Sequence, residues 1–234
     1  TKFSNYASDL DKVYEVGIEF GIETDTGDIT GNIVSKTNFI GFKEDFSQFL
    51  TELEGIQNQL PPMYSAIKIN GNPLYYWARK GVYLYRMPRR VDIQKIELIE
   101  KSINTAILRV TCSKGTYIRS LIEKLGRNLN SFATVISLRR LEVGEMHLNN
   151  KSYSFEDSYQ SLIDKVLPCD AMLSDLAKVK IKKEDVKKVR NGLSIDYNAQ
   201  VKNKGLVRIY TEKEIFLGIG EFSDNKLQPK RLIS

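Results

Sequence analysis

The residues best suited to chemistry lie at 112–121, where a predicted strand gives way to a predicted helix. Apolar residues alternate over 106–112, as in a strand, and then recur every three or four residues as one helical stripe. Gly126 within that stripe costs little. Arg119 falls in the first helical turn, beside the stripe. Because helix N-termini favour anions, an arginine there usually faces an acidic side chain or a phosphate; a solvated arginine or a structural ion pair is the alternative.

Tyr14 and two aspartates form a second group of candidates. Tyr14 opens the apolar face of a regular strand predicted at 14–22. Aromatic residues are favoured on pleated surfaces, so a purely structural core tyrosine is the alternative. Asp25 and Asp28 lie in the turn that follows, where such side chains cap their own backbone. This loop offers too few oxygen ligands for a metal ion.

Composition limits the class of protein. The 234 residues are 41% hydrophobic and 27% charged, enough for one large domain and a small one. We expect a soluble, cytoplasmic protein, because no stretch resembles a membrane span or a signal peptide. Two cysteines do not make a disulfide framework, and the single His147 argues against a histidine metal centre. The net charge of +6 indicates an acidic partner, most commonly nucleic acid.

The segment at 57–90 has the composition of an RNA-binding surface. Lysines and arginines alternate there with tyrosines and a tryptophan, punctuated by glycine and proline. Cationic groups contact phosphates while aromatic rings stack on unpaired bases. The alternative is a surface hairpin and helix with Tyr75, Tyr76 and Ala78 packed inward.

The order of elements predicts an α+β fold with a mixed, mostly antiparallel sheet. Strands are expected at 14–22, 91–100, 103–112 and 135–143, with helices at 1–11, 41–55, 118–129 and 155–167. A short basic helix at 182–190 and three short strands then predict a small barrel or sandwich. We therefore expect one domain at 1–175, with an insertion at about 57–90, and a β-rich domain at 176–234.

Seven motifs, taken together in this order and spacing, resemble the TruB-type tRNA pseudouridine synthases. They are Lys2-Phe3-Ser4, Lys12-Val13-Tyr14, Thr24-Asp25-Thr26 with Asp28, Pro62-Met63-Tyr64-Ser65-Ala66-Ile67-Lys68, Leu74-Tyr75 with Ala78-Arg79, Ser113-Lys114-Gly115-Thr116-Tyr117-Ile118-Arg119, and Leu138-Arg139-Arg140-Leu141. The resemblance covers essentially the whole chain. It implies a pseudouridine synthase domain followed by a compact PUA-like RNA-binding domain.

The resemblance also implies an activity and a set of site residues. Members isomerise uridine 55 in the T loop of tRNA by flipping the base into a pocket, without metal or cofactor. Tyr14 matches the tyrosine that stacks on the flipped base and is implicated in proton transfer, and Arg119 matches the arginine that pairs with the catalytic aspartate. The residues matched to the substrate uridine are Tyr14, Tyr117, Leu138 and Asp28. Those matched to RNA contacts are Tyr64, Lys68, Arg79, Lys114 and Arg139. The expected partner is the tRNA T-arm, bound by a monomer.

One family feature is missing from the sequence. The nucleophilic aspartate of these enzymes lies in a Gly-x-Leu-Asp-Pro-type loop just before the segment matching residues 1–3, and these 234 residues contain no Asp-Pro pair. We therefore expect Thr1 to be an internal position of a longer protein and the chain alone to be inactive. Asp25 and Asp28 are conceivable substitutes, although the sequence places neither beside Arg119. A non-catalytic tRNA-binding or folding module is the competing hypothesis, and a basic globular protein without RNA function is a third.

Overall fold

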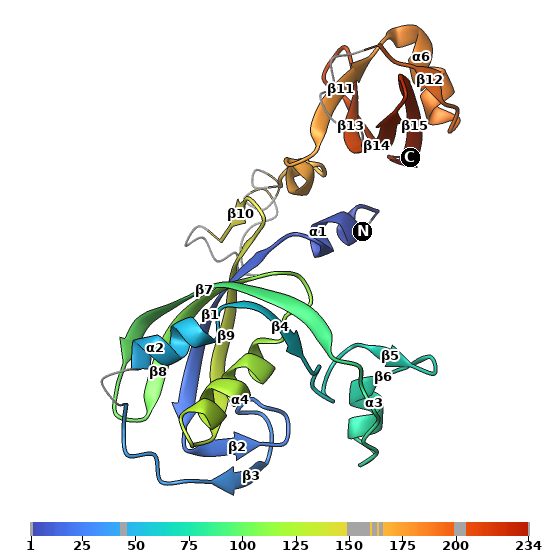
Figure 1. The fold of residues 1–234 in the computed structure, drawn as a ribbon. Coiled ribbons are helices and arrows are strands. Elements are labelled where there is room, and N and C mark those ends of the chain that lie inside the picture. The colour runs from blue at the N-terminus through green and yellow to red at the C-terminus, as the bar shows by residue number, and fades with distance from the viewer. Residues whose placement is uncertain are drawn as a thin grey trace. The chain divides into compact units, whose positions relative to one another are not determined.

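The structure is a computed structural model that describes residues 2–42, 46–148, 160, 163, 166–198 and 205–233. Its contacts divide the chain into two compact units (Figure 1). One unit is Leu10–Val143, and the other combines Thr1–Asp9 with Gly144–Ser234. Each is described separately.

An antiparallel sheet forms the centre of the unit at residues 10–143. Its strands within this unit, in spatial order β9-β1-β8-β7-β4, are β9 (Ala133–Val143), β1 (Lys12–Phe20), β8 (Thr105–Cys112), β7 (Arg89–Lys101) and β4 (Gly55–Gln59). A small hairpin of β2 (Ile22–Thr24) and β3 (Ile33–Lys36) follows β1. Two helices, α2 (Phe46–Glu52) and α4 (Ile118–Asn128), share one apolar core with the sheet. The unit therefore has two layers.

The core of this unit follows from the alternation of the sequence. Along β8 every second residue is buried, ending at Cys112. The α4 stripe of Ile118, Leu121, Ile122 and Leu125 packs against this face, with none of these side chains more than 4% exposed. Burial of that stripe fixes the rotation of α4 about its axis.

The insertion between β4 and β7 has its own small core. It contains a hairpin of β5 (Lys68–Ile69) and β6 (Asn72–Pro73) followed by α3 (Leu74–Ala78). Met63, Leu74 and Ala78 are buried together, whereas Tyr75 and Tyr76 are 41% and 37% exposed. Of the three residues in the inward-packing alternative, only Ala78 is buried. Residues 57–59, which were expected in the insertion, belong to the edge strand β4.

The other unit is a second small sheet with short helices. Its strands, in the order β11-β13-β14-β15-β12, are β11 (Ala177–Ile181), β13 (Gly205–Thr211), β14 (Phe216–Ser223), β15 (Lys226–Leu232) and β12 (Ile195–Asp196). It also contains β10 (Met146–His147), α6 (Lys183–Arg190), the 3-10 helix η1 (Ala171–Leu173) and α1 (Ser4–Ser8). Among the strand pairings described for this sheet, only β11–β13 is parallel. Phe3 packs against Leu173, and its ring centroid lies 5.6 Å from that of Phe216, so the N-terminal segment belongs to this unit.

The α+β class and the mostly antiparallel sheet are confirmed. The strand predicted at 14–22 ends at Phe20, and the helix predicted at 41–55 is the shorter α2. The helix predicted at 155–167 lies largely outside the described residues. The contacts separate the units near 143, not near 175, and group residues 1–9 with the C-terminal part. The functional division into a synthase domain and an RNA-binding domain stays a prediction.

Gly126 is required by packing, not merely tolerated. A Cβ on Gly126 would lie 2.6 Å from the Ala133 nitrogen and 2.7 Å from the Phe132 carbonyl carbon, both backbone atoms that cannot rotate away. In an exposed helix, Gly→Ala would gain about 1 kcal/mol. Here we expect Gly126→Ala to lower the free energy of unfolding by about 1–3 kcal/mol in a denaturant titration. The exposed Asn128→Ala in the same helix is the control, expected within about 0.5 kcal/mol of wild type; equal stability of both variants would contradict the packing argument.

Candidate active site

The predicted strand-to-helix junction is present and sets the position of Arg119. Strand β8 ends at Cys112, and Gly115 turns the chain with φ +78°, a conformation that favours glycine. The Thr116 hydroxyl donates to the Ser113 carbonyl at 2.9 Å, and α4 then begins at Ile118. Because Ile118 points into the core, Arg119 emerges beside it, at the edge of the buried face.

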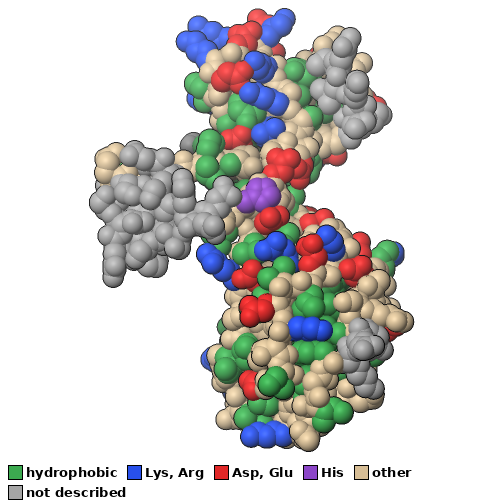
Figure 2. All heavy atoms as spheres, turned by 90° about the vertical axis from the view of Figure 1, so that its left-hand side faces the viewer, with side chains coloured by type: hydrophobic (Ala, Val, Ile, Leu, Met, Phe, Trp, Pro, Cys, Tyr) green, Lys and Arg blue, Asp and Glu red, His purple; other side chains and the backbone are tan. Residues whose placement is uncertain are grey.

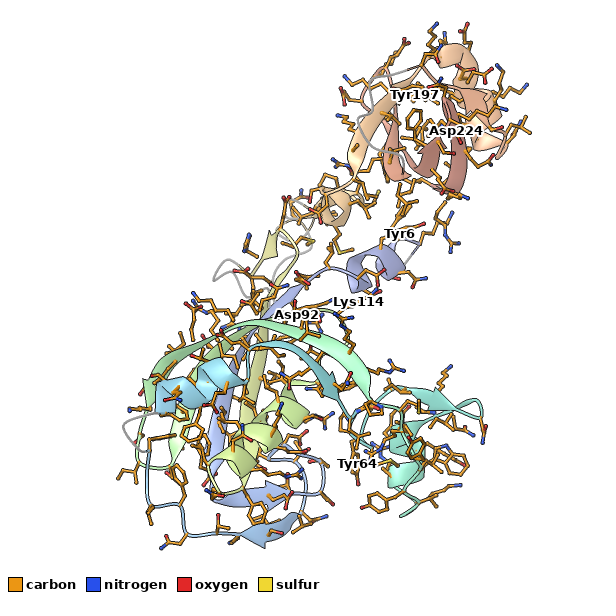
Figure 3. All side chains as sticks on the ribbon, viewed as in Figure 1. Tyr6, Tyr64, Asp92, Lys114, Tyr197 and Asp224 are labelled. Carbon is orange, nitrogen blue, oxygen red and sulfur yellow. The ribbon has the colours of Figure 1, made fainter. Side chains whose placement is uncertain are left out.

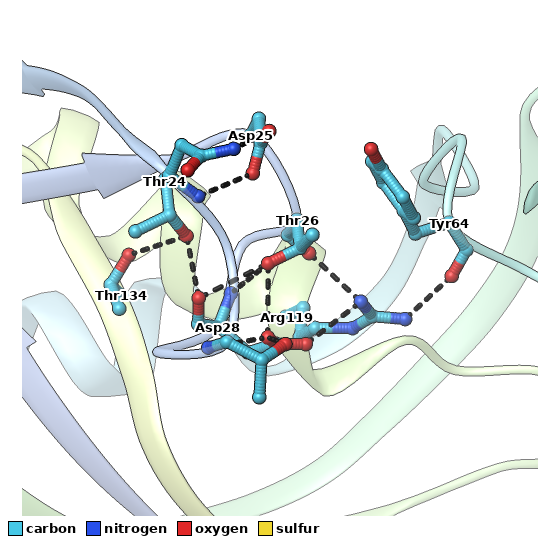
Figure 4. A network of polar contacts seen from close by, with 9 residues as sticks. Thr24, Asp25, Thr26, Asp28, Tyr64, Arg119 and Thr134 are labelled. Atoms are coloured by element: carbon cyan, nitrogen blue, oxygen red, sulfur yellow. Dashed lines mark hydrogen bonds and ion pairs between the residues drawn. The ribbon is translucent and has the colours of Figure 1, made fainter. Parts of the chain in front are cut away.

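The Arg119 guanidinium joins two loops that are distant in sequence. Its Nη1 donates to the Thr26 carbonyl at 2.8 Å and to Asp28 Oδ2 at 3.0 Å, and its Nη2 donates to the Tyr64 carbonyl at 2.7 Å (Figure 4). Tyr64 lies on the side of the insertion nearest α4 (Figure 3). The acidic partner that the sequence left open is therefore Asp28. Of the five N–H donors of the group, Nε–H and one Nη2–H have no partner among the described residues.

Asp28 is held by its own turn as well as by Arg119. Its Oδ1 accepts from the Thr26 hydroxyl at 2.9 Å and from the Thr30 amide at 3.1 Å. Burial favours the neutral acid, but hydrogen bonds from Thr30 and Thr26 and the charge of Arg119 outweigh it and lower the pKa of Asp28. The turn is attached to β9, because Ile29 donates its amide to the Val135 carbonyl at 2.9 Å. Asp28 is therefore an ionised, fixed group at neutral pH.

Tyr14 and Leu138 share one face of the sheet on neighbouring strands. Leu138 of β9 lies opposite Val16, two residues after Tyr14 on β1, and is 47% exposed. The Arg140 guanidinium carbon lies 5.7 Å from the Tyr14 ring centroid. Burial raises the pKa of Tyr14, although Arg140 opposes this, so the ring is a neutral phenol at physiological pH. Helix α4 packs on the same face, but one pocket shared by Tyr14, Tyr117, Arg119 and Leu138 stays a prediction.

The remaining predicted residues are spread over several elements. Lys68, Arg79 and Arg139 have exposed side chains, and the Arg79 guanidinium lies 5.5 Å from the centre of the Tyr75 ring. Lys114 is also exposed, near Asp92, where β7 begins and β8 ends (Figure 3). Tyr117 immediately precedes α4. The structure therefore brings Asp28, Arg119 and Tyr64 together, while Lys68, Arg79, Lys114 and Arg139 are surface cations.

A cavity of about 380 Å³ lies between the insertion and α4. It is lined by Leu60–Met63, Tyr83 and Arg86 on one side and by Ser120, Glu123, Lys124 and Arg127 on the other, with Gln57, Asn58, Gln59, Asp25 and Thr26 completing it. Burial raises the pKa of Glu123, against the charges of the nearby arginines. The sequence patterns did not indicate this cavity, because its walls are formed by four separate segments of the chain.

The Cys112 thiol is buried at the end of β8. Burial raises the pKa of the Cys112 thiol to about 11, so it is not an activated nucleophile. Among the described residues, no group of three or more His, Cys, Asp and Glu side chains is placed to hold a metal ion. The described part of the chain also has no helix long and apolar enough to cross a membrane.

The Asp28–Arg119 ion pair should make the stability of the fold depend on pH. Because the folded-state pKa of Asp28 is lowered, its contribution is present above its unfolded pKa of about 4 and is lost as pH falls through the folded value. We expect Asp28→Asn to lower Tm at pH 7, with the difference from wild type shrinking below about pH 4. Asp25→Asn is the control, since the Asp25 carboxylate accepts hydrogen bonds only from Asn32 of the same turn among the residues that the structure describes. A difference that is constant between pH 3 and 7 would contradict the role of the ionised pair.

Family models identify both parts of the chain. Residues 1–118 match the model described as TruB family pseudouridylate synthase (N terminal domain), and residues 177–233 match Pseudouridine synthase II TruB, C-terminal. A protein of Clostridium kluyveri called tRNA pseudouridine synthase B is 35% identical over 99% of this chain and 81% of its own length. Proteins of the same name from Buchnera aphidicola and Azoarcus sp. are 39% and 38% identical over 100% of this chain and 80% and 78% of theirs.

Solved structures agree on the fold. A Cbf5-Nop10-Gar1 complex matches with a TM-score of 0.65 at 23% identity, over 97% of this chain and 67% of that one. An H/ACA RNP bound to a substrate RNA containing 2'-deoxyuridine matches with a TM-score of 0.66 at 19% identity, over 100% and 69%. These likenesses concern the fold alone. The sequence matches, which include relatives above 30% identity over nearly the whole chain, show that the chain belongs to the TruB family of pseudouridine synthases.

Proposed function

We propose that this chain carries the tRNA grip and most of the uridine pocket of an enzyme that isomerises uridine 55 in the T loop of tRNA to pseudouridine. The relatives named above are called tRNA pseudouridine synthase B. The observation that carries the proposal is Arg119, held at the start of α4 by Asp28, Thr26 and Tyr64, with two of its N–H groups unpaired among the described residues. Two neighbouring N–H groups of a guanidinium can donate to the two oxygens of one carboxylate.

The nucleophile in this proposal is an aspartate from outside the 234 residues. The sequence contains no Asp-Pro pair. Asp28 is unsuited to attack on the sugar, because its carboxylate oxygens already accept four hydrogen bonds. Arg119 would orient the incoming carboxylate through Nε–H and Nη2–H, while Asp28 balances its charge. Positioning of this kind can supply several kcal/mol of barrier lowering.

Tyr14 and Leu138 would then receive the flipped base. The Tyr14 ring is a neutral phenol beside a half-exposed Leu138, so it offers an aromatic face with a hydroxyl at its end. Stacking on such a ring offsets part of the unstacking cost of extruding a base. Proton transfer at the sugar by this hydroxyl is part of the same proposal.

The insertion provides the RNA grip. Tyr83, Tyr85 and Met87 are 74%, 81% and 70% exposed, and Arg89 and Arg90 follow directly. Exposed rings beside cations are what unpaired bases and their phosphates require. On the face drawn in Figure 2, by contrast, basic and acidic side chains are interspersed over the 10–143 unit. We therefore assign T-arm binding to the insertion, with the protein acting as a monomer.

The second candidate function is a tRNA-binding or folding module without catalysis. Every RNA contact proposed above would be retained in such a module. The two functions differ in turnover, not in binding.

Replacing Arg119 should separate chemistry from binding. In the full-length protein, we expect Arg119→Ala to lower the rate of pseudouridine formation about 100-fold or more, since the nucleophile loses its orienting partner. The Kd for tRNA should change less than about threefold, because phosphate contacts elsewhere supply most affinity. Arg109→Ala, which removes an arginine paired with Glu15 on the sheet, is the matched control.

The 234-residue chain alone should bind tRNA without turnover. Turnover by this chain would overturn the proposal of an external nucleophile.

Binding should depend steeply on salt. Phosphate contacts release counterions, so loss of one phosphate-contacting cation lowers the slope of log Kd against log salt by about 1. We expect this for Lys68→Ala and Arg79→Ala, measured by filter binding or anisotropy from 50 to 300 mM salt. Lys95→Ala removes the same charge from a lysine paired with Glu97 and should leave the slope unchanged. Equal slopes for all three variants would remove Lys68 and Arg79 from the RNA interface.

A further inference from the structure

Gln59 makes an unusual contact between the last residue of β4 and the residue that precedes α4. Its side chain is only 7% exposed. The Gln59 Nε2 donates to the Tyr117 carbonyl at 3.0 Å, and the Tyr117 amide donates to Gln59 Oε1 at 2.7 Å. One carboxamide thus pairs with both backbone groups of one residue, as a neighbouring strand would.

The Tyr117 amide depends on this contact for its hydrogen-bond acceptor. It has extended backbone angles, φ −99° and ψ 107°, and the start of α4 has no side-chain cap. The first amides of a helix find no partner within the helix. Gln59 supplies the acceptor for Tyr117, and it also donates to the carbonyl that accepts the first helical bond, from Leu121 at 3.1 Å. Gln59 therefore fixes the direction in which α4 begins.

The contact also lies where the insertion leaves the sheet. Leu60 follows Gln59, and its carbonyl accepts from the Ser120 hydroxyl at 3.2 Å. Four residues further on, the Tyr64 carbonyl accepts from Arg119. The start of α4 is thus fastened to the root of the insertion at three successive points, of which Gln59 is the most buried.

We propose that Gln59 is a positioning residue for pseudouridine formation. It holds the Tyr117 backbone and the first turn of α4, so that the Tyr117 ring and the Arg119 guanidinium keep their directions when the insertion takes up RNA. Gln59 itself touches no reacting atom. This inference rests on the proposed function, because it assigns Tyr117 and Arg119 to the uridine site.

A buried glutamine that served only stability would behave differently. Its loss would lower Tm and reduce the amount of folded enzyme, with kcat per folded molecule unchanged. A positioning role predicts a lower kcat, with an unchanged KM for tRNA, in folded protein. A titratable side chain at position 59 offers a reversible way to make this distinction.

The test uses Gln59→Glu in the full-length protein. An ionised carboxylate accepts from the Tyr117 amide but cannot donate to its carbonyl, whereas a protonated carboxyl group does both. Burial raises the pKa of such a group toward neutrality. We expect kcat relative to wild type to fall about 10- to 100-fold at pH 8 and to recover at least fivefold by pH 6, with KM for tRNA within about threefold.

Three comparisons complete the experiment. Gln59→Met, similar in size but without hydrogen bonds, should lose kcat at both pH values without recovery. Gln57→Glu on the same strand is the matched control and should show neither effect, because Gln57 contacts Leu53 and Lys124 instead of Tyr117. Thermal unfolding of each variant reports the folded fraction. A normal kcat for folded Gln59→Glu at pH 8, or a loss confined to KM, would overturn the proposal.

A second measurement does not require turnover. In ¹⁵N-labelled 234-residue chain, Gln59→Met should shift the Tyr117 amide and the Arg119 Nε–H resonances, while Gln57→Met leaves both in place. Unchanged resonances would overturn the positioning role directly. Absence of pseudouridine formation by wild-type full-length protein would instead overturn the proposed function, and these resonances would still decide whether Gln59 positions Arg119.

Discussion

The half-buried Arg119 guanidinium is the interaction on which the site depends. Three segments meet at it: the turn after β2, the first turn of α4 and the root of the insertion. The Arg119 and Asp28 side chains are 22% and 25% exposed. Removing an arginine from water without an anion is costly, and a buried polar group left unpaired is costly too. Asp28 therefore allows Arg119 to occupy this position, and the two backbone carbonyls fix its orientation.

The rest of the fold can be understood as holding those three segments in place. Burial of the α4 stripe sets which way Arg119 leaves the helix, and Gly126 lets the helix approach the backbone at Phe132 and Ala133. The same stretch continues into β9, to which the Asp28 turn is attached through Val135. Gln59 fastens the start of the helix to the end of β4. A packing change at Gly126 would therefore reach the ion pair through β9 as well as through α4.

Local sequence patterns predicted the strands and helices, because these depend on residues close together in the chain. The alternation along β8, the stripe of α4 and the strand around Tyr14 were found where expected, because the period of a strand or helix repeats within a few residues. The pairing of Asp28 with Arg119 joins positions 91 apart, so no local pattern carries it. The packing of Phe3 on Phe216 was missed for the same reason, and with it the grouping of residues 1–9 with the C-terminal unit. Strand β4 was missed because its sequence, Gly-Ile-Gln-Asn-Gln, contains one apolar side chain and so shows no apolar alternation; that side chain, Ile56, is 61% exposed at the sheet edge.

The Asp28–Arg119 ion pair also bears on how RNA binding and catalysis are divided in the proposed function. If a nucleophilic carboxylate were the sole anion near Arg119, a chain lacking it would contain a largely buried cation with no neutralising partner, which is costly because the charge has lost its hydration. Asp28 removes that dependence, because it neutralises Arg119 from within the chain and leaves Nε–H and one Nη2–H for a second carboxylate. In the proposed function, the uridine pocket would then be organised before the nucleophile is in place. Preorganised donors cost no rearrangement at the moment of reaction, which is the property that electrostatic catalysis requires.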